Sequence, residues 1–287
     1  MVTGTNVSTY FNGVWKNENV PVMRAADHGS WLGTSVFDGA RFFEGVAPDL
    51  WAHCDRVNKS AKAMMITPTV STDDMVDIVW EGLKRYPVNS AIYIRPMYWS
   101  LDGGYLAIVP KENETGFAIC LEEIPMADPL ATSTLTQTSF RRPVLEDNVV
   151  NAKAGCLYPN NARMLAEAQK KGFGNALVAD SMGNVAETAT ANIFMSKDGE
   201  VFTPIPNGTF LAGITRNRHI KNFRETGINV TEKVLTFEDF RQAEEVFMTG
   251  NMMKVTPVTK FEDTHYQFGP MANLARTMYW DWAHSKA

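Results

Sequence analysis

The segment Leu211-Ala-Gly-Ile-Thr-Arg216 leads into a predicted helix that runs from about Ile214 to Glu225, with Gly227 just beyond its end. A helix N-terminus presents unpaired backbone N–H groups and a partial positive charge, so it suits a phosphate group. The hydroxyl of Thr215 adds a further donor. The alternative is an ordinary capped helix start. This segment therefore predicts a phosphate site only in combination with other features.

Three further segments have residues suited to chemistry. Lys153 lies among small uncharged residues in Asn151-Ala-Lys-Ala-Gly-Cys156, where desolvation favours a neutral, nucleophilic amine. Glu187, in the stretch 183–192, lies at a strand end and could hold a proton on a partner nitrogen. The turn at 249–253 contains Gly and Asn, and its N–H groups could converge on an anion. The alternatives are a surface lysine, a solvated glutamate and a plain turn.

Composition narrows the class of protein. A chain of 287 residues suggests one large domain or two modest ones. Its net charge of −5 argues against a nucleic-acid partner. No uncharged apolar run of about 18 residues and no signal-peptide pattern are found, so no membrane partner is expected. Three widely spaced cysteines without a Cys-x-x-Cys pair favour a cytoplasmic location. No metal site is expected, because the cysteines are far apart and His28 and His53 each stand alone in the sequence.

The hydrophobic pattern predicts an α+β chain in three parts. We expect a small N-terminal domain at 1–121, an interdomain linker at 122–134 and a larger domain at 135–287. In the first domain the expected elements are a hairpin around Asn12-Gly13, a strand at 35–43, helices at 50–65 and from Ser71 to about 85, and β-rich segments at 91–96, 105–109 and 116–122. In the second domain we expect strands at 134–141, 176–179, 191–195, 201–203, 229–235 and 245–249, and helices at 159–171, 214–225, 237–242 and 271–283.

Taken in order, these motifs make the chain resemble the fold-type IV pyridoxal-phosphate (PLP) aminotransferases. That group holds branched-chain and D-amino-acid aminotransferases, (R)-amine transaminases and aminodeoxychorismate lyase. The segments that carry the resemblance are 33–41, 53–56 with 60–61, 93–96, Lys153 with Tyr158, 183–192, 211–216, and 246–250 with 256–257. The resemblance implies a D-amino-acid-aminotransferase-like fold, with a small N-terminal α/β domain and a larger, β-barrel-like C-terminal domain. It also implies a homodimer.

The resemblance assigns roles to individual residues. Lys153 would be the catalytic residue, which bonds covalently to PLP and moves the proton. Glu187 would pair with the pyridine nitrogen, and Tyr158 would approach the phenolic oxygen of the ring. The other expected cofactor-binding residues are Arg56, Gly213, Ile214, Thr215 and Asn251. The expected substrate-binding residues are Phe37, Arg41, Tyr93, Arg95, Gly250, Met252 and Met253.

The motifs at 37–41 and 93–96 look most like those of the branched-chain type. We therefore expect transamination between an L-amino acid, branched-chain or broadly apolar, and 2-oxoglutarate. Three differences from the branched-chain type leave other amino donors as alternatives. Trp31-Leu-Gly33 stands where that type commonly has a His-Tyr-Gly run. The turn Asn251-Met-Met253 is bulky, and the loop at 100–106 is short. The alternatives are an (R)-amine or D-amino-acid transaminase, a PLP lyase of the aminodeoxychorismate lyase type, and a non-catalytic binder of small molecules.

Overall fold

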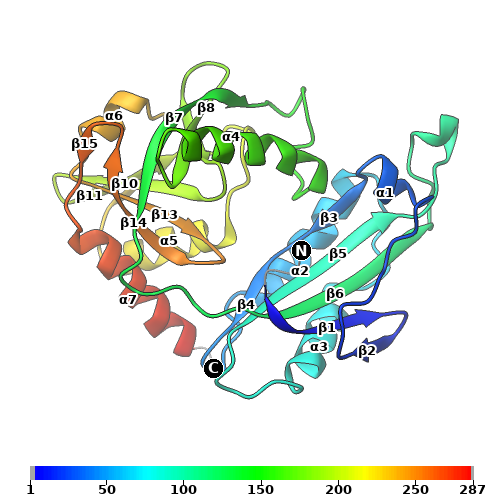
Figure 1. Cartoon of the computed structure of the whole chain (residues 1–287). Helices are drawn as coiled ribbons and strands as arrows, with labels where there is room; N and C mark the ends of the chain where they lie inside the picture. The colour runs from blue at the N-terminus through cyan, green and yellow to red at the C-terminus, as the bar shows by residue number, and fades with distance from the viewer. Residues whose placement is uncertain (1–3, 286–287) are drawn as a thin grey trace. The chain divides into compact units, whose positions relative to one another are not determined.

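The structure is a computed structural model that describes residues 4–285, and it divides into two compact units (Figure 1). Of the described residues, unit 1 comprises 4–126 together with Asn151–Leu157. Unit 2 comprises Ala127–Val150 and residues 158–285. The division between Met126 and Ala127 falls inside the segment that we expected to be a linker, and the segment around Lys153 packs with unit 1.

Unit 1 is an antiparallel sheet with helices on one face. The strand order is β2-β1-β6-β5-β3, and β4 also pairs with β5. The strands are β1 (Thr5–Phe11), β2 (Val14–Lys16), β3 (Ser35–Phe37), β4 (Ala40–Phe42), β5 (Ile92–Ser100) and β6 (Thr115–Glu123). The helices are α1 (His28–Trp31), α2 (Leu50–Ala63) and α3 (Thr72–Leu83), with 3₁₀ turns η1 (Tyr105–Ala107) and η2 (Gly155–Leu157).

The two faces of β5 have different roles. Ile92, Ile94 and Tyr98 are buried in the core on the face that packs against α2 and α3. Tyr93 and Arg95 point to the opposite face and are only half-buried, as the twofold periodicity of a strand requires. This second face is available for a binding site.

Most expected elements of unit 1 are present, and two expectations are wrong. The Asn12-Gly13 hairpin is confirmed, with φ of 52° and 81° as a tight primed turn demands. Ser71 Oγ accepts the N–H of Asp74 and caps α3. The single strand expected at 35–43 is broken at Asp38-Gly39, because Asp38 turns inward to an arginine and a histidine. In the segment 105–109, Tyr105–Ala107 form a 3₁₀ turn and the expected strand is absent, with φ of 53° at Leu106.

Unit 2 is a larger sheet flanked by helices. Its strand order is β12-β11-β10-β13-β14-β7-β8-β9, with β15 paired to β14. The strands are β7 (Ser133–Arg142), β8 (Asn175–Asp180), β9 (Val185–Thr188), β10 (Asn192–Lys197), β11 (Glu200–Pro204), β12 (Val230–Lys233), β13 (Glu245–Gly250), β14 (Lys254–Phe261) and β15 (Thr264–His265). The helices are α4 (Tyr158–Lys170), α5 (Ile214–Glu225), α6 (Phe237–Arg241) and α7 (Pro270–His284). The sheet curls, so that β9 comes back against β10 and β11.

The curl gives unit 2 a core on each side of the sheet. Ile193 and Met195 of β10 join the inner cluster, which also contains Phe261. Phe194, between them in sequence, faces the other way and stacks on Phe247, with ring centroids 5.2 Å apart. This outer cluster is covered by α5 and α7. Because both faces of β10 are buried, its central residues Ile193, Phe194 and Met195 are apolar in succession and lack the alternation of a half-exposed strand.

None of the helices within residues 4–285 is both long and apolar enough to span a bilayer.

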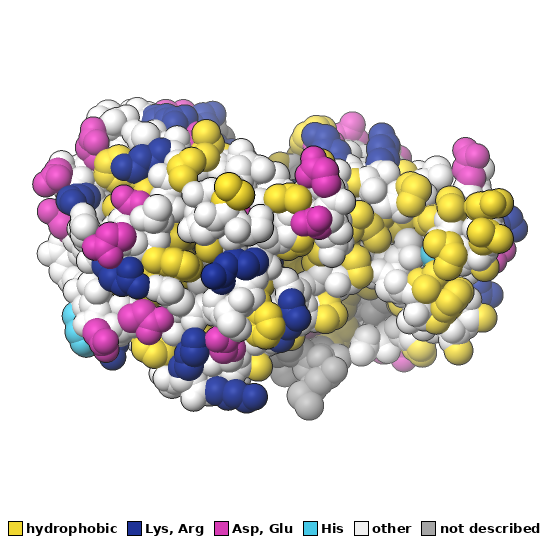
Figure 2. All heavy atoms as spheres, turned by 90° about the horizontal axis from the view of Figure 1, so that it is seen from above, with side chains coloured by type: hydrophobic (Ala, Val, Ile, Leu, Met, Phe, Trp, Pro, Cys, Tyr) yellow, Lys and Arg dark blue, Asp and Glu magenta, His cyan; other side chains and the backbone are white. Residues whose placement is uncertain are grey.

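Charged and apolar side chains are distributed differently over the surfaces of the two units. Figure 2 shows Lys, Arg, Asp and Glu side chains interspersed over unit 2 and hydrophobic side chains gathered at one end of unit 1. Tyr105, Leu106 and Ile108 are among the most exposed apolar side chains of unit 1.

Candidate active site

Lys153 is fixed in unit 1 through its own backbone. Its N–H donates to Ser60 Oγ of α2 at 3.0 Å, and its carbonyl accepts the N–H of Phe37 at 3.1 Å. Ala152 and Ala154 are fully buried on either side. The lysine side chain extends over β3, and Nζ lies 5.0 Å from the centroid of the Phe37 ring. The backbone of Lys153 is therefore fixed, and its amine lies beside an aromatic ring.

Three expected substrate residues lie on the open face of the unit 1 sheet, and one of them, Phe37, contacts this lysine. Phe37 pairs with Met97 in the β3–β5 register, so Phe37 lies on the same face as Tyr93 and Arg95. The Arg95 guanidinium carbon lies 5.0 Å from the centroid of the Tyr93 ring. Gly39 lets Tyr93 approach, because a Cβ on Gly39 would collide with the Tyr93 hydroxyl. An apolar surface, a phenol and a cation thus share one face with Lys153.

Arg41 occupies a different environment from the other expected substrate residues. Its register partner is Tyr93, but its side chain is fully buried. Nη2 donates to the carbonyl of Ile124 at 2.6 Å. Burial lowers the pKa of Arg41 to about 10. These contacts give Arg41 a part in holding β4 and the residues after β6 together.

Arg56 is anchored by a carboxylate that sequence reasoning did not select. Nε and Nη2 of Arg56 donate to the two oxygens of Asp38, at 2.6 and 2.9 Å. His53 Nδ1 lies 2.7 Å from the same carboxylate. Burial raises the pKa of Asp38, but the charges of Arg56 and His53 outweigh it and hold that pKa well below its usual range. Asp38 therefore stays ionised and orients the guanidinium expected to bind phosphate.

Glu187 lies in β9 of unit 2, and both of its oxygens are held. Arg142 Nη2 lies 3.1 Å from Oε1, and Asn192 Nδ2 donates to Oε2 at 3.2 Å. Arg142 is fixed in turn by the carbonyls of Thr188 and Ala189, at 2.9 and 3.1 Å. A carboxylate oriented in this way can accept a charge-assisted hydrogen bond from a protonated ring nitrogen.

Asn192 links Glu187 to the N-terminus of α5. Its Oδ1 accepts the N–H of Gly213 at 3.1 Å, and its Nδ2 also donates to the carbonyl of Leu211 at 3.0 Å. Gly213 is the N-cap of α5 and supplies no side-chain cap to the first turn. The predicted helix start at Gly213, Ile214 and Thr215 is therefore confirmed as an element, and its phosphate role stays a prediction.

Two buried polar side-chain atoms that have no hydrogen-bond partner within residues 4–285 lie at the end of β13 and in the turn that follows it. Thr249 is the register partner of Asn192, and Thr249 Oγ1 is one of these atoms. Asn251 Nδ2 is another, whereas Asn251 Oδ1 accepts a bond from Lys254 Nζ at 2.5 Å. Buried polar groups without partners are uncommon, and an absent ligand is one cause. This group of atoms fits an anion with several acceptor oxygens.

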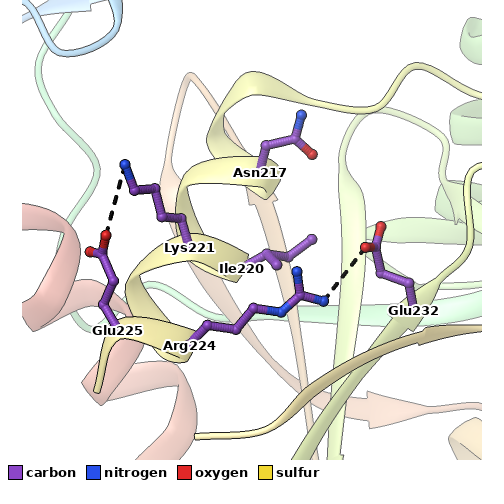
Figure 3. Close-up of a pocket in the computed structure, with 6 residues that line it drawn as sticks. All are labelled: Asn217, Ile220, Lys221, Arg224, Glu225 and Glu232. Atoms are coloured by element: carbon purple, nitrogen blue, oxygen red, sulfur yellow. Dashed lines mark ion pairs between the residues drawn. The ribbon is translucent and has the colours of Figure 1, made fainter. Parts of the chain in front are cut away.

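The remaining expected residues of unit 2 are more exposed. Tyr158 is the first residue of α4 and is 37% exposed. Met252 is 40% exposed in the turn after β13, and Gly250 and Met253 are half-buried. A separate groove of about 460 Å³ lies along α5, where Lys221 pairs with Glu225 and Arg224 with Glu232 (Figure 3). The groove's ionic side chains are paired with one another, and its lining includes none of the expected site residues.

The model of the family "Amino-transferase class IV" matches residues 35–261, which is more than half of the chain. The branched-chain-amino-acid aminotransferase of Escherichia coli (strain K12) is 32% identical over 262 residues, covering 87% of this chain and 83% of that protein. The chain belongs to the class IV aminotransferase family.

Solved structures agree with this membership and with the two-domain fold expected from the sequence. An aminotransferase from Brucella abortus, bound to the cofactor PLP, is 54% identical, with a TM-score of 0.95 over 97% of this chain and 99% of that one. A branched-chain amino acid aminotransferase from Escherichia coli is 27% identical, with a TM-score of 0.87 over 96% and 94% of the two chains. The branched-chain aminotransferase of the archaeon Thermoproteus uzoniensis, solved with norvaline, is 24% identical and shares the fold, with a TM-score of 0.88 over 97% and 95%. The expectation of a fold-type IV aminotransferase is confirmed.

The sequence motifs of this aminotransferase pointed to the expected reactive residues but not to the residues that hold their side chains in place. Asp38, Arg142 and Lys254 were not selected, although each contacts an expected site residue. Asp38 had a signal, because it lies inside the motif 37–41 and is an acid among small and apolar residues. Arg142 and Glu187 are far apart in the sequence, and no local pattern predicts that pairing.

Proposed function

We propose that this enzyme transfers an amino group between an L-branched-chain amino acid and 2-oxoglutarate, with PLP as its cofactor. The observation that carries the proposal is the position of Lys153 Nζ beside Phe37, on the sheet face that also bears Tyr93 and Arg95. This combination suits substrates with an apolar side chain in one half-reaction and a carboxylate side chain in the other. The relatives named as branched-chain aminotransferases support the same choice.

The residues present fit the cofactor. The first turn of α5, Thr249 Oγ1 and Asn251 Nδ2 would receive the phosphate, together with Arg56. Glu187 would bind the ring nitrogen and Tyr158 the phenolic oxygen. PLP supplies, when bound, the electron sink that accepts the electrons of the broken Cα–H bond.

The chain's own groups would do the rest. Lys153 Nζ would take the Cα proton and return it, which requires a neutral amine for part of the cycle. The Phe37 ring, whose centroid lies 5.0 Å from Nζ, helps to place the amine on the face of the sheet that bears Tyr93 and Arg95. Glu187, fixed by Arg142 and Asn192, would keep a proton on the ring nitrogen. The turn 250–253 would bind the substrate's α-carboxylate through backbone N–H groups.

A half-reaction assay tests the proposal. The purified enzyme, loaded with PLP, is mixed separately with L-leucine, D-alanine and (R)-1-phenylethylamine, and the cofactor absorbance is followed. We expect L-leucine to convert the cofactor fastest, and 2-oxoglutarate to restore it. Conversion by the chiral amine alone, or by D-alanine alone, would contradict the proposal and favour the alternative transaminases.

We further propose that the enzyme is a cytoplasmic homodimer. The resemblance to its family supports the dimer. The three cysteines support a reducing compartment, since the structure leaves Cys54, Cys120 and Cys156 as free thiols. Light scattering of the purified protein during size exclusion measures the assembly directly, and a monomer at all concentrations would contradict it.

A further inference from the structure

A small pocket lies on the open face of the unit 1 sheet, next to the substrate residues. It has a volume of about 290 Å³, and its lining includes Val22, Arg95, Met97, Cys120 and Glu122. The β5–β6 register pairs Arg95 with Cys120 and Tyr93 with Glu122, so Glu122 shares a face with Phe37. Arg95, which brings a positive charge to this lining, is the group expected to bind a side-chain carboxylate.

Arg95 already has a carboxylate partner within the protein. Its Nη1 forms an ion pair with Glu122 Oε1. The Glu122 side chain is only 4% exposed, against 29% for Arg95, so Glu122 lies deeper in the sheet. The Gly4 N–H donates to Glu122 Oε2 at 3.2 Å, and Cys120 Sγ donates to Oε1 at 3.6 Å. These contacts help to hold the Glu122 carboxylate in place.

Both partners are ionised near neutral pH. Burial raises the pKa of Glu122, but hydrogen bonding and charge from Arg95 bring it below its ordinary value. Burial lowers the pKa of Arg95, and Glu122 more than restores it. The pair therefore carries no net charge toward the pocket, and an incoming side-chain carboxylate meets a guanidinium that is already neutralised.

We propose that Glu122 is a specificity-determining residue, which holds Arg95 and thereby handicaps substrates with a side-chain carboxylate relative to substrates with an apolar side chain. This inference rests on the proposed function, because it takes Arg95 as part of the substrate pocket. An apolar side chain has no charge to be repelled by Glu122, so the pair does not weaken its binding. A dicarboxylate must share Arg95 with Glu122 and approach a second negative charge.

The direct test is Glu122→Gln, which keeps the shape and an acceptor oxygen but removes the charge. The matched control is Glu123→Gln, because Glu123 is adjacent, lies on the opposite face and accepts from Asn6 Nδ2 at 3.2 Å. The amine form of the holoenzyme is reacted in single turnovers with 2-oxoglutarate and with 4-methyl-2-oxopentanoate. The ratio of their second-order rate constants should rise about tenfold in Glu122→Gln and stay within about twofold in Glu123→Gln.

A double-mutant cycle separates specificity from structure. In the Arg95→Ala background, Glu122→Gln should raise the ratio less than about threefold, because only the repulsion by Glu122 is then removed and no guanidinium is released to bind the carboxylate. The inference is overturned if Glu122→Gln leaves the ratio unchanged, or if Glu122→Gln raises the ratio equally with and without Arg95. Neither outcome affects the turnover of L-leucine by the wild type, on which the proposed function depends. Failure of the wild type to react with L-leucine would overturn the proposed function instead. If neither Glu122→Gln nor Glu122→Ala folds, Glu122 serves the stability of the sheet and the inference is wrong.

Discussion

At the scale of single residues, the decisive feature of the site is that the backbone of Lys153 is fixed on both sides. Ser60 and Phe37 fix the N–H and the carbonyl, and the Phe37 ring lies near the amine. A lysine in this position has a long, flexible side chain on a fixed stem. Such a side chain suits a group that bonds to a cofactor and also moves a proton.

Replacing Lys153 by alanine should abolish catalysis without unfolding the protein. We expect turnover to fall by at least about a thousandfold, because both the covalent attachment and the proton transfer are lost. Borohydride reduction followed by peptide mass spectrometry should label Lys153 in the wild type and no lysine in the variant. Lys62→Ala is the control, since Lys62 is exposed on α2. Label on another lysine, or near-normal turnover, would remove Lys153 from its assigned role.

Arg95→Ala should damage the two half-reactions unequally. The glutamate half-reaction should lose roughly 10- to 150-fold in kcat/KM, since hydrogen bonds to charged groups contribute about 1.5–3 kcal/mol. The leucine half-reaction should change little, because an apolar side chain does not use the guanidinium. The variant leaves Glu122 buried without its cation, so the double variant Arg95→Ala/Glu122→Gln controls for that strain. Equal losses in both half-reactions would argue against carboxylate binding by Arg95.

At the scale of elements, the important connection in unit 2 is the one between β9, β10 and the start of α5. Asn192, the first residue of β10, bonds to Glu187 of β9 and to Leu211 and Gly213 before α5. The groups expected to bind the two ends of the cofactor, its ring nitrogen and its phosphate, are thus tied to one amide. The distance between them is set by a side chain and two strands, which is the rigid support that a binding site needs.

Asn192→Ala should therefore weaken cofactor binding more than it weakens the fold. Three hydrogen bonds are lost, each worth about 1 kcal/mol, and we expect the PLP dissociation constant to rise roughly 10- to 100-fold. Fluorescence titration of the apoenzyme measures this constant. Asn229→Ala is the control, because Asn229 also donates to a glutamate, Glu200, but at an exposed site. An unchanged constant in Asn192→Ala would show that the α5 start is positioned by other contacts.

The elements that sequence patterns predicted correctly are those with local causes. The Asn12-Gly13 hairpin, the Ser71 cap and the start of α5 follow from turn and cap chemistry within a few residues. The break of the strand at Asp38 has a distant cause, because it depends on Arg56 and His53 of α2. The strand β14 was missed because the pairing partners that define it, β13 and β7, are not visible in its own sequence.

The same distinction between local and distant causes applies to the residues of the candidate site. Lys153 and Glu187 were found because each is a charged residue in a stretch of small or neutral ones. Their partners Ser60, Arg142 and Asn192 carry no such contrast, and only the fold brings them into contact. The ion pair of Arg95 with Glu122 was missed for the same reason, although it balances the charge of the guanidinium.

At the scale of the whole molecule, one buried histidine should govern the stability of unit 2 in mild acid. His219 of α5 is fully buried, its Nε2 lies 3.3 Å from the carbonyl of Lys254, and its ring centroid lies 5.3 Å from that of Tyr279. Burial, chiefly, lowers the pKa of His219 to about 4. The histidine therefore belongs to the folded state in its neutral form, joining α5, β14 and α7.

The sign of the pH dependence follows from this shift. Above about pH 6.5 His219 is neutral in both states, and the unfolded chain begins to bind its proton first as the pH falls. Stability should therefore drop between about pH 6.5 and pH 4, by on the order of 3 kcal/mol from this residue, and the drop should end once the folded state is protonated too. Asp38 contributes in a lower range, because its pKa is held below the usual value of 3.8 and its ion pair persists until more acid pH.

Urea unfolding at about pH 7.5, 6, 5 and 4.5 can isolate the histidine. His219→Gln cannot titrate, so its free energy of unfolding should be lower than that of the wild type at the highest pH and should converge on it at the lowest. His265→Gln is the control, because His265 is exposed on β15 and should leave the wild-type slope unchanged. If the wild type and His219→Gln lose stability in parallel across this range, His219 does not bind its proton differently in the two states. The acid sensitivity would then belong to the carboxylates, and it should appear mainly below about pH 4, where Asp38 titrates.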